Sequence, residues 1–465
     1  MRQSTRKKLA TILVGGALLC GAPLAAQETD LTFDEARAIG QQAAINGDIE
    51  LALALSSSLL QADPTDSFAW LIRSSALLQA QEHAAARDAA AEAHRNAPSG
   101  PLRYEAARLA ALAATNEERF TIATWWLRRA LIDAPNEAET ERTLQDAAIV
   151  SSRNPWQTSV QLSFQPSDNV NGGVDEEFFE INGINTFGAL SRDSQPLSGW
   201  TSNLSFSTRY RLSQSEDHQT FVGLRANFRG VILSDESREE LSESGRPTSN
   251  SDYSYGTLST FWSRDNALEV GDWGLEASVG ARWLYGDWDE TFVRVGVNRS
   301  IPLSDYTLAR GSLWAEVNSP LDDRDDVQKV GAVLSYTEVF PDIAVVSSTI
   351  GYTEAMSDFI NARSSTWFLA VSAQPLEQIG PAQVTVQAGF QIADYPDWTF
   401  FTFGTEIEAG RQDETLFANI DLAFPDMSFA GFEPVVTLES SSTTSNVNRF
   451  ERESFGIGLT FQSSF

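Results

Sequence analysis

The sequence contains one cysteine, Cys20, and three histidines in 465 residues. It offers no pair of thiols for a disulfide and few nitrogen or sulfur ligands for a metal. Basic residues are also scarce, since 33 Lys and Arg stand against 63 Asp and Glu and leave a net charge of -30. Phosphate binding needs basic surface, which argues against nucleic acid as a partner. Outside the N-terminus no apolar run reaches about 18 residues, which excludes a membrane-spanning helix.

Groups for catalysis are equally sparse. His83 and His94 fall on expected helices and His218 falls on a short turn. None of them accompanies a serine and a carboxylate on one strand face, as a hydrolase would require. The acidic run LDDRDD (321–326) carries oxygen ligands suited to Ca²⁺, but we interpret it as a solvated loop. We expect no enzyme activity, no cofactor and no metal site.

The N-terminus has the order of a secretory signal. Four cations in MRQSTRKK precede the apolar run LATILVGGALLC and the small-residue segment GAPLAAQ. We expect a signal peptide over 1–26, cleaved after Ala26, which removes Cys20. Lipidation of Cys20 is the alternative, but the residue before it, Leu19, is large. The mature chain then depends on packing and on ladder hydrogen bonds.

Composition changes sharply near 152–155. Residues 30–150 are rich in Ala, Leu, Glu and Arg, whereas 154–465 are rich in Ser, Thr, Gly, Val, Phe and Trp. We expect two domains, over 27–150 and 154–465. In the first, Pro64, Pro98 and Pro135 follow one another at intervals of 34 and 37 residues. This period and its closing proline are typical of tetratricopeptide repeats, which are helix–turn–helix units.

The repeats predict helices near 33–45, 48–61, 66–80, 83–96, 101–114, 118–132 and 136–148. Small residues at Ala52, Ala86 and Ala123, each twelve before a repeat's proline, allow the paired helices to approach closely. Repeats of this kind have a concave surface that binds partner proteins. Four residues are predicted to face that groove: Arg37, Gln41, Leu71 and Ser75. A purely structural plug or spacer is the alternative.

The second domain reads as strands throughout. In WQTSVQLSFQ (156–165), apolar or weakly polar residues alternate with polar ones, and 200–212, 273–285 and 384–392 repeat the pattern. We count fifteen candidate strands. A single-chain bacterial membrane barrel has an even number, so one strand is divided or merged wrongly, and the junction at 340–342 is the weakest.

The alternation leaves open whether the apolar row faces a dry core or lipid. Seven arginines lie on the polar faces: Arg209, Arg211, Arg225, Arg229, Arg282, Arg294 and Arg310. A dry sandwich core would not accept them without paired acids, whereas a water-filled lumen does. Trp and Tyr near strand ends, and long loops (166–199, 234–252) against short turns (213–219, 302–305), also fit a membrane barrel. The apolar row is therefore predicted to face lipid.

Two sets of barrel residues are candidates for a function. Arg209, Arg211, Arg225 and Arg229 form a predicted positive strip on the lumen wall. They either brace the barrel through Glu276, Glu316 or acidic loops, or guide an acidic substrate segment. At the C-terminus, one parity of the segment FGIGLTFQSSF carries a signal of the type read by the barrel-assembly machinery: Phe455, Ile457, Leu459, Phe461 and Phe465.

The chain resembles the surface lipoprotein assembly modulator family. The resemblance lies in NPWQTSVQLSFQPSDNVNGG (154–173), which is similar to that family's first strand and polar loop, and in GFEPVVTLESSSTTSNVNRFERESFGIGLTF (431–461), which is similar to its last hairpin. The middle strands match by pattern alone. The resemblance implies an N-terminal tetratricopeptide-repeat α-solenoid in the periplasm, followed by an antiparallel transmembrane β-barrel of about 14 strands in the outer membrane.

The same resemblance implies a function. Such a barrel delivers client proteins across the outer membrane, either surface lipoproteins or secreted ligand-capturing proteins, and the repeats engage them in the periplasm. The expected partners are such a client, the barrel-assembly machinery and outer-membrane lipids. An outer-membrane porin or polysaccharide export channel is the alternative, although polysaccharide exporters carry more repeats. A scaffold that merely anchors the repeats is a third possibility.

Overall fold

The computed structural model describes residues 31–98, 100–174, 178–181, 184–402, 405–429 and 431–463. The predicted signal peptide (1–26) and Phe465 lie outside these residues. The chain divides into two compact units, and along the sequence the division falls between Asn154 and Pro155. The first unit is helical and the second is a closed barrel of strands.

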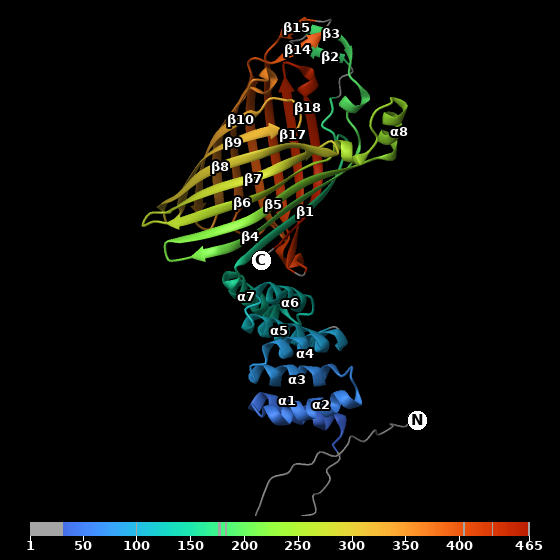
Figure 1. Cartoon of the computed structure of the whole chain (residues 1–465), viewed down its shortest axis with the longest axis vertical. Coiled ribbons are helices and arrows are strands. Elements are labelled where there is room, and N and C mark those ends of the chain that lie inside the picture. The colour runs from blue at the N-terminus through green and yellow to red at the C-terminus, as the bar shows by residue number, and fades with distance from the viewer. Residues whose placement is uncertain are drawn as a thin grey trace, which may run out of the picture. The chain divides into compact units, whose positions relative to one another are not determined.

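The described part of the first unit contains seven helices (Figure 1). They are α1 (Phe33–Asn46), α2 (Ile49–Ala62), α3 (Ser67–Gln79), α4 (His83–Asn96), α5 (Pro101–Asn116), α6 (Phe120–Ile132) and α7 (Glu137–Arg153). Side-chain caps fix several of their starts: Thr32 forms a capping box before α1, and Asp66 accepts from the Ala69 N–H before α3. Among the described residues, no helix is both long and apolar enough to cross a membrane.

Alanines hold the helices of the first unit close together. Ala52, Ala86 and Ala123, the small positions of the repeat, are completely buried. A larger cluster joins α4 to α7 around Tyr104 and Trp126, and most of its other members are alanines. Side chains this small let helix axes approach closely. The helical half of the fold prediction is confirmed; the structure differs mainly at α7, which continues five residues beyond the predicted end at 148.

The second unit is a closed antiparallel barrel of 14 strands. In order around the wall, the strands are β1 (Trp156–Ser167), β4 (Gly199–Gln214), β5 (His218–Leu233), β6 (Tyr255–Ala267), β7 (Asp272–Leu284), β8 (Asp287–Ser304), β9 (Thr307–Pro320), β10 (Val327–Phe340), β11 (Ala344–Ser357), β12 (Ser364–Pro375), β13 (Gln383–Tyr395), β16 (Arg411–Ala423), β17 (Phe432–Ser445) and β18 (Arg452–Ser463). The count of fifteen from the sequence is wrong by one. The junction at 340–342 is a tight turn between β10 and β11, in which Asp342 has a φ of 62°.

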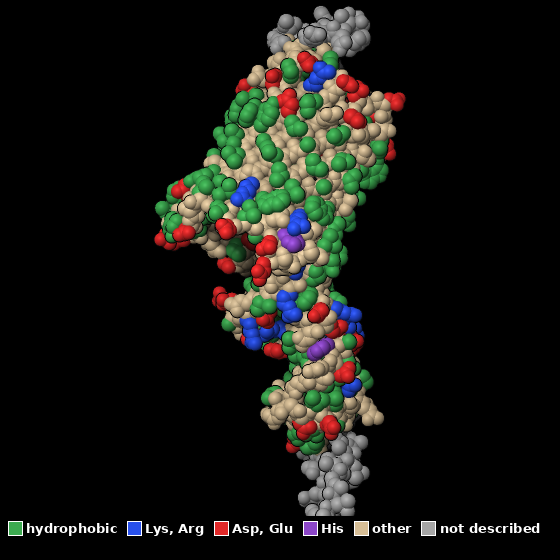
Figure 2. Space-filling view, turned by 60° about the vertical axis from the view of Figure 1, so that its left-hand side comes forward, with side chains coloured by type: hydrophobic (Ala, Val, Ile, Leu, Met, Phe, Trp, Pro, Cys, Tyr) green, Lys and Arg blue, Asp and Glu red, His purple; other side chains and the backbone are tan. Residues whose placement is uncertain are grey.

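The apolar row of each wall strand faces outward. Trp156 and Phe164 of β1 are exposed, as are Leu313 of β9, Leu334 of β10 and Leu416 of β16. Figure 2 shows hydrophobic side chains spread over the barrel wall, with charged side chains mostly toward its ends. An apolar exterior around a polar interior is the pattern of a membrane barrel. The predicted fold class, a helical unit followed by a membrane barrel of about 14 strands, is confirmed.

The two ends of the barrel differ in their connections. At one end the strands are joined by short turns; at the other, two connections run over 168–198 and 234–254. The long connections contain structure that the sequence patterns did not predict: β2 (Phe178–Ile181), β3 (Ile184–Ala189) and α8 (Asp235–Glu243), with β14 (Thr399–Thr402) and β15 (Thr405–Glu408) at the same end (Figure 1). We call this the long-loop end.

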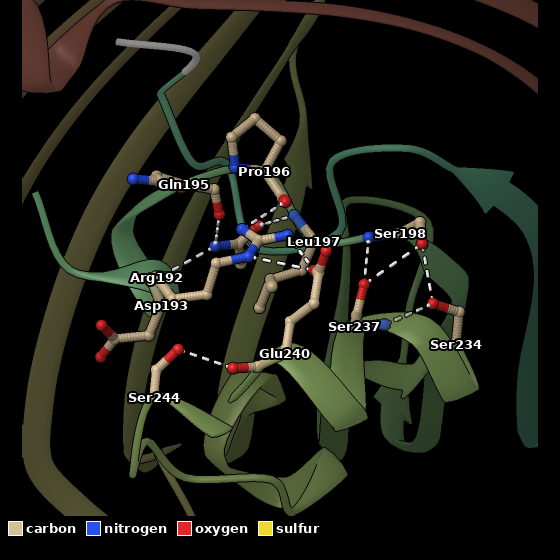
Figure 3. Close-up of polar contacts among 11 residues, drawn as sticks. Arg192, Asp193, Gln195, Pro196, Leu197, Ser198, Ser234, Ser237, Glu240 and Ser244 are labelled. Carbon is tan, nitrogen blue, oxygen red and sulfur yellow. Dashed lines mark hydrogen bonds and ion pairs between the residues drawn. The ribbon is translucent and has the colours of Figure 1, made fainter. Parts of the chain in front are cut away.

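The first two long connections pack together as an ordered lobe. Its core consists of buried apolar residues from both connections and from β5: Val170, Leu197, Val231, Leu233 and Leu241. Polar contacts surround this core, as Figure 3 shows. Arg192 Nε donates to Glu240 of α8 at 3.0 Å, and the Ser198 N–H donates to the Ser237 hydroxyl at 2.8 Å. The two connections at the long-loop end therefore form a packed structure with its own apolar core.

Candidate functional site

The predicted lumen arginines lie on the polar face of the wall, opposite the exposed residues Leu204 and Leu224. Arg209 of β4 donates through Nε to Gln157 Oε1 of β1 at 2.7 Å. Its guanidinium lies 4.2 Å from the centre of the Phe221 ring of β5. The hydrogen bond ties β4 to β1, and the cation–π contact ties β4 to β5.

Arg225 and Arg229 of β5 make contacts that bind wall elements together. Arg225 forms two hydrogen bonds to the Glu276 carboxylate of β7, at 3.1 and 3.3 Å. Arg229 Nη1 donates to the Val170 carbonyl of the first long connection at 3.0 Å. These are the contacts that the bracing interpretation of the arginine strip requires. Arg211 shares the lumen face of β4 near its end.

A second charged network lies on the same wall. The sequence indicated its arginines and Glu316 as lumen residues but did not predict that they pair with each other. Glu316 of β9 is 5 % exposed and accepts from Arg282 at 2.8 Å and from Arg294 at 3.3 Å. Arg282 also contacts Glu290 and donates to Asn318 at 2.8 Å, and Lys329 is the register partner of Glu316 on β10. The available signal was hairpin register, because Arg282 stands opposite Glu290 and Arg294 opposite Glu316.

The lumen wall also carries a repeated arrangement that we call the glycine–aromatic pairs. In each, a glycine is the register partner of an aromatic residue on a neighbouring strand. The five pairs are Gly223 with Phe261, Gly280 with Phe292, Gly331 with Trp314, Gly351 with Phe368, and Gly389 with Phe417. They occupy alternate strand–strand seams from β5–β6 to β13–β16.

In every glycine–aromatic pair, a methyl group on the glycine would come within 3.0 Å of ring atoms. The rings therefore lie across their glycines, against the wall. Three of them also carry an arginine on their faces: Arg225 lies 4.6 Å from the Phe261 centroid, Arg282 5.2 Å from Phe292, and Arg294 3.9 Å from Trp314. The effect is a wall in which large aromatic rings occupy little of the lumen and cations cover some of them.

We expect Gly351→Val to lower the free energy of barrel unfolding by about 1–3 kcal/mol, because Phe368 must leave its place against the wall. Urea unfolding of the chain in lipid vesicles measures the change. Gly296→Val is the matched control on the lumen face of β8, since its nearest neighbour, the Leu313 carbonyl oxygen, would be 3.5 Å from the added atom. An equal loss in both variants would show that adding a side chain to a lumen-facing glycine, and not the collision with the ring, is responsible.

In the helical unit, the predicted groove residues differ in what they contact. Arg37 of α1 donates through Nε to the buried Asp66 at 3.0 Å and also pairs with Asp34. It therefore helps to join α1 to the start of α3. Gln41 is exposed, and Leu71 and Ser75 are half-buried on α3.

A pocket of about 400 Å³ lies elsewhere in this unit, between α5, α6 and α7. Leu112 of α5 and Ile149 of α7 are exposed apolar residues in its lining. Arg108 lies beside them and pairs with Asp146 at 2.5 Å. The sequence signal that could have indicated this pocket is the pair of leucine and isoleucine side chains on otherwise polar helix faces.

The described part of the predicted assembly signal lies on β18. Phe455, Ile457, Leu459 and Phe461 are exposed on its outward face. In the acidic run at 321–326, Arg324 donates to Asp322 at 2.8 Å and to Asp289 at 2.6 Å, so part of its charge is internally compensated. Within the described residues, no group of three or more His, Cys, Asp and Glu side chains is arranged to hold a metal.

No family model and no curated protein matches the sequence. Among solved structures, the barrel is similar to an outer membrane channel from Pseudomonas putida, with 10 % identity over 66 % of this chain and 94 % of that one, at a TM-score of 0.35. It is also similar to the TodX monoaromatic hydrocarbon channel (9 %, 67 % and 91 %, TM-score 0.34). The helices are similar to the TPR2B domain of yeast Sti1, with 18 % identity over 26 % of this chain and 98 % of that one, at a TM-score of 0.25.

Proposed function

We propose that the chain is an outer-membrane translocator that delivers client proteins across that membrane, with its helical repeats in the periplasm. The clients are surface lipoproteins or secreted ligand-capturing proteins, as the family resemblance implies. The observation that carries the proposal is the covalent combination of a helical-repeat unit with a closed 14-strand barrel. Repeats of this kind bind polypeptides, and a barrel of this size can enclose a wet interior.

The lumen chemistry supports the proposal. The glycine–aromatic pairs keep large rings against the wall, and Arg225, Arg282 and Arg294 lie above three of them, each paired with a lumen carboxylate. A surface of this kind offers many weak contacts to a moving polypeptide. A porin or a polysaccharide export channel remains the second candidate, because a cationic wall also favours small anions or acidic polymers.

Deleting the coding region and comparing the surface proteome with that of the parental cells tests the proposal. We expect one specific protein to be retained within the cell envelope of the deleted cells. A plasmid copy of the gene should restore that protein to the cell surface. The parental cells are fractionated, since we also expect a heat-modifiable barrel in the outer membrane and residues 27–150 protected from protease added outside. An unchanged surface proteome with a reduced flux of small anions or polysaccharide would replace the translocator with the channel.

A further inference from the structure

The seam between β1 and β18 is the least paired in the barrel. Among the described residues, only four register pairs join these strands: Gln161 with Gln462, Leu162 with Phe461, Ser163 with Thr460, and Phe164 with Leu459. The next shortest ladder, between β12 and β13, has nine pairs, from Ser365 with Asp394 to Ala373 with Val386. Both strands are longer than their shared ladder, since β1 and β18 each pair over 12 residues with their other neighbours.

Toward the long-loop end, the ladder between the two strands stops. Among the described residues, no ladder pair joins 165–167 of β1 to 452–458 of β18. Gln165 bridges this part of the seam with its side chain, which crosses Gly456 and donates to Glu439 Oε1 of β17 at 2.8 Å. An aromatic ring covers the backbone at each glycine of the glycine–aromatic pairs. At Gly456 the flexible side chain of Gln165 covers it instead.

The connections above the seam tie it at the long-loop end. Ile181 of β2 forms an isolated β-bridge with Val447, and the Glu180 N–H donates to Asn448 Oδ1 at 2.8 Å. These contacts join the connection after β1 to the connection before β18. Among the described residues, the seam is thus held by a short ladder, the hydrogen bond from Gln165 to Glu439 and the two loop contacts.

The surroundings of the seam suit an extended polypeptide. On the lumen side, a recess of about 500 Å³ borders the ladder and is lined mainly by amides and hydroxyls, among them Gln161, Gln462 and Thr460. On the outer side, Phe455 and Ile457 are exposed and apolar. The edge of β18 over 452–458, which makes no ladder pair with β1 among the described residues, therefore lies between a polar and an apolar face, and Gln165 covers it at Gly456.

We propose that the β1–β18 seam is a strand-addition site, which takes an extended polypeptide segment of alternating polar and apolar residues onto the edge of β18. An unpaired strand edge is a template for another strand, and backbone groups facing hydrocarbon need hydrogen-bond partners. The identity of that segment as part of the client rests on the proposed function. Addition there places polar residues toward the lumen and apolar residues toward lipid.

A photoreactive peptide tests the site on the full chain in lipid vesicles. The probe copies the sequence of Trp156–Ser167, because β1 is the strand that faces the β18 edge, and carries a benzophenone at the position of Phe164. Cross-links mapped by mass spectrometry are expected within 452–458 and 165–167. Ser163→Cys with Thr460→Cys, oxidised to a disulfide across the ladder, should reduce them at least tenfold, and reduction should restore them.

The control pair is Thr337→Cys with Ser347→Cys, which stand opposite each other on the long β10–β11 ladder. Its disulfide should leave the cross-linking unchanged. Gln165→Ala, which removes the bridge to Glu439, should raise the yield severalfold. Cross-links spread over several seams, or equal yields with the β1–β18 seam locked and unlocked, would overturn the proposal. The assay contains no client, so its result is independent of the proposed function. The peptide can fail to bind while client export is intact, and it can bind although the proposed export function is wrong.

Discussion

Replacing Glu316 by leucine is expected to lower the free energy of unfolding of the barrel by about 3 kcal/mol. The carboxylate is 5 % exposed and accepts from both Arg282 and Arg294. With Lys329 and Glu290, the network holds three cations and two carboxylates. The substitution leaves three cations and one carboxylate. The expected loss lies at the low end for a buried pair, because the two arginines keep contact with lumen water.

Urea unfolding in vesicles, followed by tryptophan fluorescence and by unheated gel mobility, measures this loss. The control is Glu276→Leu. Glu276 pairs with Arg225 on the same wall, but both side chains are more than a third exposed, so its loss should cost less than about 1 kcal/mol. Equal costs at Glu276 and Glu316 would mean that burial does not determine the strength of the lumen ion pairs.

Acidification should weaken the helical unit through His94. Burial lowers the pKa of this imidazole to about 4, with Arg103 and Arg129 adding to the effect. The folded unit therefore keeps His94 neutral, while the unfolded chain takes up a proton near its ordinary pKa of 6.5. Stability contributed by neutral His94 is present above pH 6.5 and is lost as the pH falls. We expect a loss of roughly 2 kcal/mol between pH 7 and pH 5, approaching roughly 3 kcal/mol near pH 4.

His94→Gln separates this effect from the carboxylates that titrate in the same range. Glutamine retains an acceptor for the Arg103 Nε–H, which lies 3.3 Å from His94 Nε2, but it does not titrate. Helix content followed during urea unfolding at several pH values should show a shallower pH dependence in the variant. Parallel curves for the two proteins would show that His94 is accessible to protons in the folded state.

The elements of this protein were predictable because their signals are local. The prolines at 64, 98 and 135 and the buried alanines indicate the repeats, and Gly47 adopts the left-handed conformation that ends α1. The alternation in WQTSVQLSFQ is sufficient to predict a strand, and the lumen arginines indicate which face is wet. Long apolar faces and short turns repeat often enough to define the barrel.

The side-chain pairs could not be predicted, because they depend on the register between neighbouring strands. The sequence of a single strand does not specify that register. Gly351 and Phe368 are 17 positions apart and are paired only because β11 and β12 align as they do. The same holds for Gln165 and Glu439, which come from opposite ends of the barrel sequence. The helix α8 was missed because its residues look like polar loop, and its apolar partners come from another connection and from β5. The strand β2 was missed because it spans only four residues, and Ile181 packs against Trp398 and Val447 from other connections.

The glycine–aromatic pairs constrain the order in which the barrel can change over generations. A side chain gained at Gly351 collides with the Phe368 ring, whereas a smaller residue at position 368 removes only the ring. The permitted path therefore loses the aromatic residue first and fills the glycine afterwards. The same order of substitutions applies at all five seams. Homologous barrels should therefore contain a glycine opposite a small residue more often than a larger residue opposite an aromatic ring.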